Sequence, residues 1–115
     1  MADKRSRSHA GMAAVKDCVE NMREGVYQMR NSLKEMEDGM GRKGSQRFLF
    51  HYYNVQTWVS AALTDEWTCL ESLSGRTGRS VNSRVRTQIR RRVEKVTRLT
   101  SIALALVNKV MPGRV

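Results

Sequence analysis

The sequence of 115 residues has almost no proline and few cysteines, histidines and aromatic residues. Its one proline, Pro112, stands close to the last residue, so proline interrupts none of the apolar patterns before it. No apolar run is long enough to span a membrane, and residues 10–15 are too few and too small to form the apolar core of a signal peptide. No strand pattern competes with the helical spacing of the apolar residues. We therefore predict an all-α fold.

The residue types that carry most enzyme chemistry are sparse. The two histidines, His9 and His51, stand in unrelated contexts, and neither an acid pair nor a glycine-rich phosphate loop is present. Neither Cys18 nor Cys69 has a partner histidine or a C-x-x-C neighbour, which disfavours a metal site and thiol catalysis. We predict that the chain is not an enzyme and uses no metal or cofactor.

Apolar residues at helical spacing predict three helices. The first is expected from about Ala13 to Asp38, the second from about Phe48 to Leu73, and the third from an N-cap at Ser80 to about Val110. Glycine-containing loops between them allow the chain to reverse. With such short connections, the helices pack as antiparallel neighbours in an up-down-up bundle.

The same pattern predicts the domain organisation and the core. Residues 1–12 are expected to be a disordered basic N-terminus, residues 13–110 one helical domain, and residues 111–115 a C-terminal tail that follows a helix stop at Pro112-Gly113. One stripe of the first helix is expected to form its buried face, consisting of Val15, Val19, Met22, Val26, Met29, Leu33 and Met36. The corresponding stripe of the second helix consists of Val55, Trp58, Val59, Ala62, Leu63, Cys69, Leu70 and Leu73. That of the third helix consists of Val81, Val85, Ile89, Val93, Val96, Leu99, Ala103, Leu106 and Val110.

The two cysteines lie at matching positions of the expected hairpin. If the first two helices reverse near residues 43 and 44, Cys18 and Cys69 are equally far from the turn and therefore face each other. A disulfide is then within reach if both side chains point to the contact, and it would imply an oxidising compartment. The alternative is a pair of ordinary buried thiols.

Positive charge dominates the composition. Lys and Arg outnumber Asp and Glu by 21 to 11, which gives a formal net charge of +10. Such a surface attracts nucleic acid, acidic lipid or acidic polysaccharide without selecting one of them. Arg90-Arg91-Arg92 and the loop at residues 76–79 suggest a basic helical nucleic-acid-binding protein as an alternative function. Charge runs on helices are more often solvated, and no aromatic residues are interleaved here, so nucleic acid is the less favoured partner.

Three stretches resemble a known family. Residues 54–69 closely resemble its central V-x-T-W-x-S-A-A-L-T-x-x-x-T-C motif, residues 14–21 resemble its A-L-x-D-C-x-E helix, and residues 99–106 resemble its closing L-T-S-N-A-L-A-L helix. The family is that of the plant invertase and pectin methylesterase inhibitors. The resemblance covers nearly everything from residue 13 to residue 110.

The resemblance carries structural expectations. It implies that the three helices belong to the fold of a four-helix-bundle family and that a disulfide joins Cys18 to Cys69. It also implies an extracellular location in the apoplast or cell wall, although no signal peptide is visible in this chain. It also implies that the family's N-terminal hairpin, with its second cysteine pair, and its first bundle helix are lacking here. Three helices would leave exposed an apolar stripe that the missing helix covers, and self-association could cover it.

The resemblance also implies a function, which is inhibition of pectin methylesterase in a 1:1 complex that occludes the substrate cleft. The polar face of the second helix is the expected contact. Its small side chains, which are Thr57, Ser60, Thr64 and Thr68, allow close approach and can donate hydrogen bonds, and Asn54 and Asp65 flank them. The alternative is a plain solvated face. The acidic residues of the first helix are weaker candidates for the contact, because such charges are usually just solvated; they are Glu20, Glu24, Glu35, Glu37 and Asp38.

Two related functions are alternatives. The invertase-inhibiting branch often carries Pro-Lys-Phe before the central helix, whereas this chain has Gln46-Arg47-Phe48, so pectin methylesterase is favoured over acid invertase. The pro-region of a pectin methylesterase precursor has the same domain. Since no catalytic domain follows Val115, an independent inhibitor is the preferred expectation.

Overall fold

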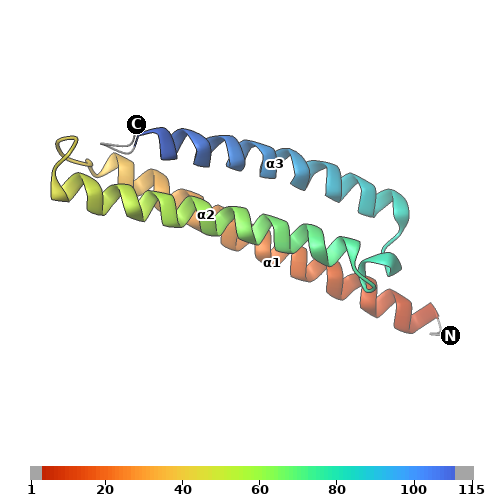
Figure 1. The fold of residues 1–115 in the computed structure, drawn as a ribbon. Coiled ribbons are helices and arrows are strands. Elements are labelled where there is room, and N and C mark those ends of the chain that lie inside the picture. Colours follow the sequence, from red (N-terminus) through yellow and green to blue (C-terminus); the bar gives the residue numbers. More distant parts are fainter. Residues whose placement is uncertain (1–3, 111–115) are drawn as a thin grey trace.

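The computed structural model describes residues 4–110, and nothing in this part of the chain forms a β-strand. It contains the long helices α1 (Lys4–Glu37), α2 (Gln46–Ser74) and α3 (Ser83–Lys109), and the short 3-10 helix η1 (Gly78–Ser80). The three long helices run up, down and up (Figure 1). The prediction of an all-α antiparallel bundle is thus confirmed. The expected tail at residues 111–115 and its stop at Pro112-Gly113 lie outside the described residues.

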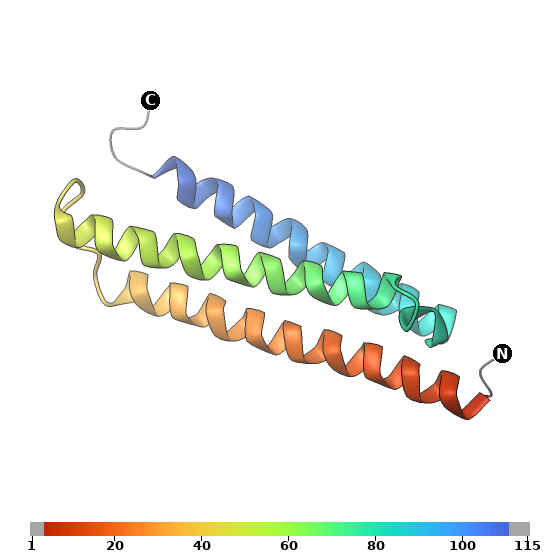
Figure 2. The same cartoon turned by 60° about the horizontal axis from the view of Figure 1, so that its bottom comes forward.

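Helix α2 is the central element of the bundle. Both α1 and α3 pack against it, and α1 also packs against η1. In the described residues, the backbones of α1 and α3 almost nowhere come close to each other, although Cys18 of α1 and Val93 of α3 belong to the same hydrophobic cluster. Figure 2 shows α2 between its two neighbours over most of its length. One side of the bundle therefore stays open between α1 and α3.

The turn between α1 and α2 follows from local chemistry. Gly39, Gly41 and Gly44 all have positive φ, a left-handed conformation that costs glycine little because it has no Cβ. Ser45 then caps α2, because its Oγ accepts a hydrogen bond from the backbone N of Phe48 at 3.1 Å. The glycine-rich segment therefore reverses the chain where the sequence predicts a loop.

Helix α3 begins two residues later than its predicted cap would place it. Ser80 was the expected N-cap, but it is the last residue of η1. Asn82 is the actual cap, and its Oδ1 accepts a hydrogen bond from the backbone N of Arg84 at 2.9 Å. The prediction of Ser80 is wrong because both residues are good caps, and only the 3-10 turn decides between them.

Helix α1 begins earlier than predicted. The expectation that residues 1–12 are disordered is wrong for residues 4–12, which continue α1. Gly11 is buried where α1 crosses η1, and a Cβ at this position would lie 3.0 Å from the backbone oxygen of Ser80. The missing side chain allows the helix to pack against a distant segment, and this contact holds the start of α1 in place.

The buried face of α1 differs from the predicted stripe. Its buried residues are all small, namely Gly11, which packs on η1, and Ala14, Cys18, Gly25 and Ser32. Val26 and Leu33 of the predicted stripe are 48% and 54% exposed. Small side chains let the two helices approach closely, and the larger ones are left at the edge of the contact. The prediction that the apolar stripe of α1 forms its buried face is therefore wrong for most of its members.

The remaining core prediction holds for α2 and fails for α3. In α2 the residues Val55, Val59, Ala62, Cys69 and Leu73 are buried, as the periodicity predicts. In α3 only Val93 and Thr100 are buried among the described residues. Because α3 packs closely against α2 alone, a single narrow face of it is covered.

The predicted Cys18–Cys69 disulfide is present and closes a sequence separation of 51 residues. Both cysteines belong to a buried cluster with Leu73 of α2 and Val93 of α3. The bridge joins α1 and α2 far from their connecting turn. It therefore fixes the open end of the hairpin while the chain itself closes the other end.

We expect Gly78→Ala to destabilise the fold by about 1–3 kcal/mol, the usual cost of overpacking a tight site. A Cβ at Gly78 would overlap the backbone carbonyl of Leu73, and backbone atoms cannot move aside as a flexible side chain can. Urea unfolding followed by circular dichroism measures the change.

Gly75→Ala is the matched control, because a Cβ there would meet the backbone oxygen of Glu71 at an ordinary 3.4 Å. Equal unfolding midpoints for the two variants would contradict the tight packing of η1 on α2.

Candidate partner-binding surface

The threonines predicted as contacts lie on one exposed strip of α2. Thr57, Thr64 and Thr68 are exposed, and Ser60 beside them is half-buried. The hydroxyl of Thr64 donates to the backbone oxygen of Ser60 at 3.2 Å, and that of Thr68 donates to the backbone oxygen of Thr64 at 2.9 Å. These two hydroxyl protons are already used within the helix. Toward a partner, Thr64 and Thr68 therefore present a methyl group and an accepting oxygen, and the expectation that they donate is wrong.

Asn54 and Asp65, also predicted as contacts, are directed to α1 instead of joining this strip. The Nδ2 of Asn54 donates to Oε1 of Glu35 at 2.7 Å. Asp65 is half-buried near Gly25 of α1, and its pKa is raised by burial and then by the negative charge of Glu24. The structure thus brings four of the six predicted residues together and places the other two at the contact of α1 with α2.

Glu35 is the centre of a polar clamp between the two helices. Its Oε1 accepts the bond from Asn54 and lies 2.6 Å from Nδ1 of His51. These two hydrogen bonds, the one from Asn54 first, lower the pKa of Glu35 below its ordinary value. The clamp therefore stabilises the fold at pH above the ordinary pKa of a glutamate and loses that contribution as the pH falls through the lowered pKa. The role of Glu35 is thus to orient α1 on α2.

Three large aromatic side chains share the exposed side of α2 with the threonine strip. Phe50, Tyr53 and Trp67 are 63%, 47% and 55% exposed. At 100° per residue they fall in the same half of the helix as Thr57 and Thr64. We call this surface the α2 outer face and define it by Phe50, Tyr53, Thr57, Ser60, Thr64, Trp67 and Thr68. Aromatic residues are enriched at protein interfaces. The face therefore combines large side chains that a partner can bury with a strip of small side chains that a partner can approach closely.

The aromatic members of the α2 outer face are not among the predicted contacts. The signal that could have found them is positional, since a helical wheel places each of them away from Val55, Val59 and Ala62. The first-helix acids that were ranked lower divide in the same way. Glu20, Glu24, Glu37 and Asp38 are exposed and solvated, whereas Glu35 belongs to the clamp.

A buried carboxyl group lies on the other side of α2. Glu66 is 3% exposed, and its Oε2 accepts a hydrogen bond from the hydroxyl of Thr100 in α3 at 2.9 Å. Its Oε1 is buried and has no hydrogen-bond partner among the described residues. Burial raises the pKa of Glu66, an effect that the bond from Thr100 opposes in part. An incompletely satisfied buried carboxylate destabilises the helix contact in which it sits.

We expect Glu66→Gln to raise the free energy of unfolding by roughly 1 kcal/mol at pH 7, because it removes a buried charge and keeps an acceptor for Thr100. A raised folded-state pKa means that wild-type stability is complete below the ordinary value of 4.5 and falls as the pH rises through the raised pKa. The gain from the substitution should therefore shrink between pH 7 and pH 4. Urea unfolding of both proteins across this range measures it, and a gain that grows toward acid would contradict the assignment.

The arginine run of α3 is solvated. Arg91 and Arg92 are exposed, and Arg90 lies 3.9 Å from Glu94 one turn away in the same helix. In residues 4–110, no three histidine, cysteine, aspartate or glutamate side chains are placed to hold a metal ion. Over the same range, no helix has the length and hydropathy needed to cross a bilayer.

Residues 1–106 match the family described as "Plant invertase/pectin methylesterase inhibitor". The chain is 44% identical over 101 residues to "Pectinesterase inhibitor 9" of Arabidopsis thaliana, which covers 88% of this chain and 48% of that protein. It is 42% identical over 96 residues to "21 kDa protein" of Daucus carota, covering 84% and 48%.

The chain also matches a much longer protein, "Pectinesterase/pectinesterase inhibitor 18" of Arabidopsis thaliana. The identity is 35%, and the match covers 94% of this chain and 17% of that protein. The chain spans about half the length of the first relatives, 48% in each case. No solved structure matches. Because the family match extends over residues 1–106 and includes both cysteines and all of α2, the chain belongs to the plant invertase/pectin methylesterase inhibitor family.

Proposed function

We propose that this chain inhibits pectin methylesterase by binding in a 1:1 complex across the substrate cleft of the enzyme. The observation that carries the proposal is the α2 outer face, an exposed surface on a helical hairpin that a disulfide holds rigid. Relatives named pectinesterase inhibitors support the choice of target, among them "Pectinesterase inhibitor 11" of Arabidopsis thaliana at 41% identity. The chain is then a binding protein and performs no catalysis itself.

Inhibition of this kind needs shape and rigidity alone. The threonine strip lets the backbone of α2 come close to an opposing surface, because no long side chain stands in the way. Phe50, Tyr53 and Trp67 supply apolar area at the borders of the strip, where burial on binding is favourable. A helix that is already ordered loses little conformational freedom on binding, so more of the contact energy appears as affinity.

The proposed contact residues follow from these positions. Thr57, Ser60, Thr64 and Thr68 meet the enzyme directly. Asn54 and Asp65 flank the strip, and Asn54 also supports it through its bond to Glu35. Since the disulfide implies an oxidising compartment, we place the protein outside the cell, in the apoplast or cell wall.

The test is a titration of the oxidised chain against pectin methylesterase and, in parallel, against acid invertase. We expect esterase activity to fall to a plateau at one equivalent, with invertase unaffected. Full esterase activity at micromolar excess would reject the proposal. Loss of invertase activity alone would assign the chain to the other branch that the family name includes.

A second candidate function is the pro-region of a pectin methylesterase precursor. It is favoured by the match to a relative whose name contains both pectinesterase and pectinesterase inhibitor. The discriminating experiment is coexpression of the chain with a pectin methylesterase catalytic domain. Improved folding of the enzyme without inhibition of the mature enzyme would favour the pro-region. A salt-sensitive shift of duplex DNA without enzyme inhibition would instead favour nucleic-acid binding.

A further inference from the structure

The outward side of α3 carries a line of cations. It consists of exposed side chains, which are Arg84, Arg91, Lys95 and Arg98. At 100° per residue they fall within a sector of about 60°, opposite Val93, through which α3 packs into the core. They extend over about 21 Å of the helix at 1.5 Å per residue. We call these side chains the α3 basic stripe.

The charges of the α3 basic stripe are not neutralised within the chain. Glu94 is the only acidic residue between Ser83 and Lys109, and it lies 3.9 Å from Arg90, outside the stripe. In residues 4–110, no carboxylate lies within ion-pair distance of a stripe residue. Neighbours three and four residues apart on a helix are close enough for like charges to repel. A ligand with a row of negative charges relieves this repulsion.

The exposed cations of α1 have a different setting. Lys16, Arg23 and Arg30 also recur along one side of their helix and are exposed. Glu20, however, is four residues from Lys16 and three from Arg23, the spacings at which opposite charges on a helix attract. Exposed Glu24 follows Arg23 directly. The two helices therefore differ in the pattern of their charges, and only α3 presents an unbroken row of one sign.

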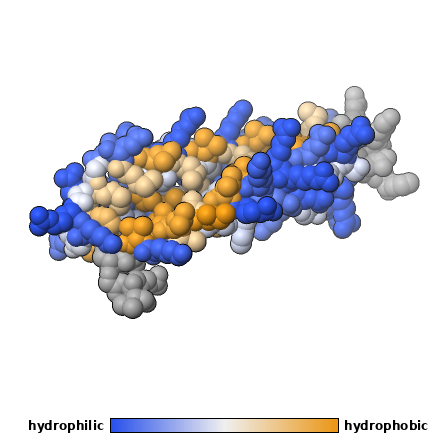
Figure 3. Space-filling model, turned by 90° about the horizontal axis from the view of Figure 1, so that it is seen from above, coloured by the Kyte–Doolittle hydropathy of each residue, from blue (hydrophilic) through white to orange (hydrophobic). Residues whose placement is uncertain are grey.

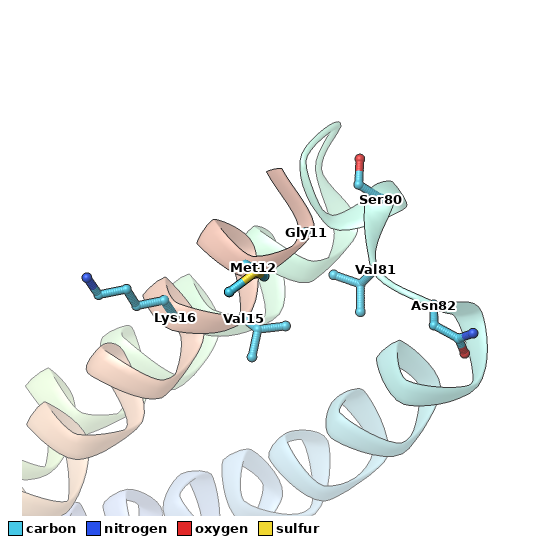
Figure 4. Close-up of a pocket in the computed structure, with 7 residues that line it drawn as sticks. All are labelled: Gly11, Met12, Val15, Lys16, Ser80, Val81 and Asn82. Carbon is cyan, nitrogen blue, oxygen red and sulfur yellow. The ribbon is translucent and has the colours of Figure 1, made fainter. Parts of the chain in front are cut away.

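The α3 basic stripe is also separate from the apolar surfaces of the molecule. The cavities between α1 and α3 are lined by residues from the other side of α3, such as Ile89, Val93 and Val96. Figure 4 shows a further cavity beside the start of α3, where Val15 and Val81 face the same space. In Figure 3, which views the molecule from above, a dense group of hydrophilic side chains lies toward the right-hand end, where α3 begins, and an apolar band lies toward the other end. A ligand of the stripe therefore needs charge and no apolar surface.

The composition of α3 narrows the class of polyanion. The helix contains no aromatic residue. Single-stranded nucleic acids are commonly held by aromatic side chains on which their bases stack, and helices that lie on membranes bury apolar residues beside their basic face. The α3 basic stripe offers neither feature. An acidic polysaccharide requires neither, because its charged groups are carboxylates on hydroxylated rings.

The compartment favours an acidic polysaccharide over duplex DNA. The Cys18–Cys69 disulfide implies an oxidising environment such as the outside of the cell, whereas nucleic acids are kept inside it. The choice of polysaccharide rests on the proposed function, because pectin methylesterase hydrolyses methyl esters of pectin. Each hydrolysed ester leaves a carboxylate on the polymer. The inhibitor therefore works beside a polymer whose negative charge grows as its target enzyme acts.

We propose that the α3 basic stripe binds polygalacturonate, the de-esterified and negatively charged form of pectin. Carboxylates along the polymer pair with the row of cations, and the arginines can hold a carboxylate through two parallel hydrogen bonds. A single exposed ion pair contributes little, so binding requires several pairs at once and hence a polymer. The stripe shares no residue with the α2 outer face. An inhibitor held in this way is retained where the esterase has already acted.

The probe is polygalacturonate, and fully methyl-esterified pectin is its control, because the sugar backbone is the same and the charge is absent. The affinity of the full oxidised chain for each polymer is measured by affinity electrophoresis without any enzyme. We expect polygalacturonate to bind at least about tenfold more tightly, with an affinity that falls as salt is added. Equal affinity for the two polymers would overturn the proposal. A chain that binds polygalacturonate but does not inhibit the esterase would reject the proposed function alone.

A triple variant tests the residues of the stripe. Arg91→Gln, Lys95→Gln and Arg98→Gln together should weaken binding to polygalacturonate at least about tenfold, because several ion pairs are lost at once. All three side chains are exposed, and glutamine is a good helix former, so the helical circular dichroism should be unchanged. Inhibition of the esterase on a short, uncharged ester should also be unchanged.

The matched control is the triple variant Lys16→Gln, Arg23→Gln and Arg30→Gln. It also removes two arginines and one lysine from exposed positions, so the change in net charge is the same. Its affinity for polygalacturonate should fall less than about threefold, since these cations have acidic neighbours. Equal losses in the two triple variants would overturn the proposal, because net charge alone would then attract the polymer. Binding of duplex DNA without binding of polygalacturonate at the same salt concentration would overturn it in favour of nucleic acid.

Discussion

Reduction of the Cys18–Cys69 disulfide should lower the free energy of unfolding by about 4 kcal/mol. The chain-entropy relation gives this value for a loop of 51 residues. The loss is large for a chain whose buried apolar residues are few, since many small domains are stable by only 5–15 kcal/mol or so. Urea unfolding with and without a phosphine reductant measures the change, and the reduced thiols keep the volume of the native side chains.

Mass spectrometry of the denatured, non-reduced chain is the control, because it counts free thiols directly. The double variant Cys18→Ala with Cys69→Ala should be insensitive to the reductant. Mass spectrometry could find the bridge in the untreated wild type, and reduction could still leave its unfolding midpoint unchanged. The disulfide would then not determine the stability of the hairpin, and its proposed contribution to a rigid binding surface would be contradicted.

Thr64→Trp should weaken inhibition of pectin methylesterase at least about 30-fold, which corresponds to the loss of one interface hot spot of about 2 kcal/mol. The side chain lies in the middle of the α2 outer face and is exposed, so an indole there prevents close approach without disturbing the core. Inhibition constants for the wild type and the variant, measured on the same enzyme preparation, give the ratio.

Ser101→Trp is the matched control, because Ser101 is an exposed small residue on α3, away from the α2 outer face. Its inhibition constant should equal that of the wild type. If Ser101→Trp abolished inhibition and Thr64→Trp did not, the enzyme contact would lie on α3 instead.

The parts of the fold that the sequence predicts well are those set by local rules. The periodicity of α2 is unambiguous because this helix is covered on two sides, so its apolar residues are truly buried. The pairing of Cys18 with Cys69 follows from the position of a glycine-rich turn. Family motifs around Thr57, Thr64 and Thr68 also indicate residues that lie together on one exposed strip of the helix.

The sequence-based predictions are wrong where the burial of a residue depends on which helix packs against it. The stripe of α1 containing Val26 and Leu33 has helical spacing, but spacing does not reveal that α1 meets α2 through Gly25 and Ser32. Asn54 and Asp65 are polar like the threonine strip. They face α1 because Glu35 lies opposite Asn54 and Gly25 lies opposite Asp65, which the sequence pattern of α2 does not reveal. The aromatic residues of the α2 outer face are exposed because the bundle leaves that side uncovered, a property of the assembled helices rather than of any short pattern.

The isolation of α3 from α1 has a consequence for how the molecule opens. The disulfide joins only α1 and α2, while α3 is held mainly by its packing on α2 and by its connecting loop. The amide protons of α3 should therefore exchange with deuterium faster than those of the cross-linked hairpin, because detaching one lightly buried helix costs less than unfolding the whole domain. Native-state exchange would then resolve two cooperative units within a chain of 115 residues.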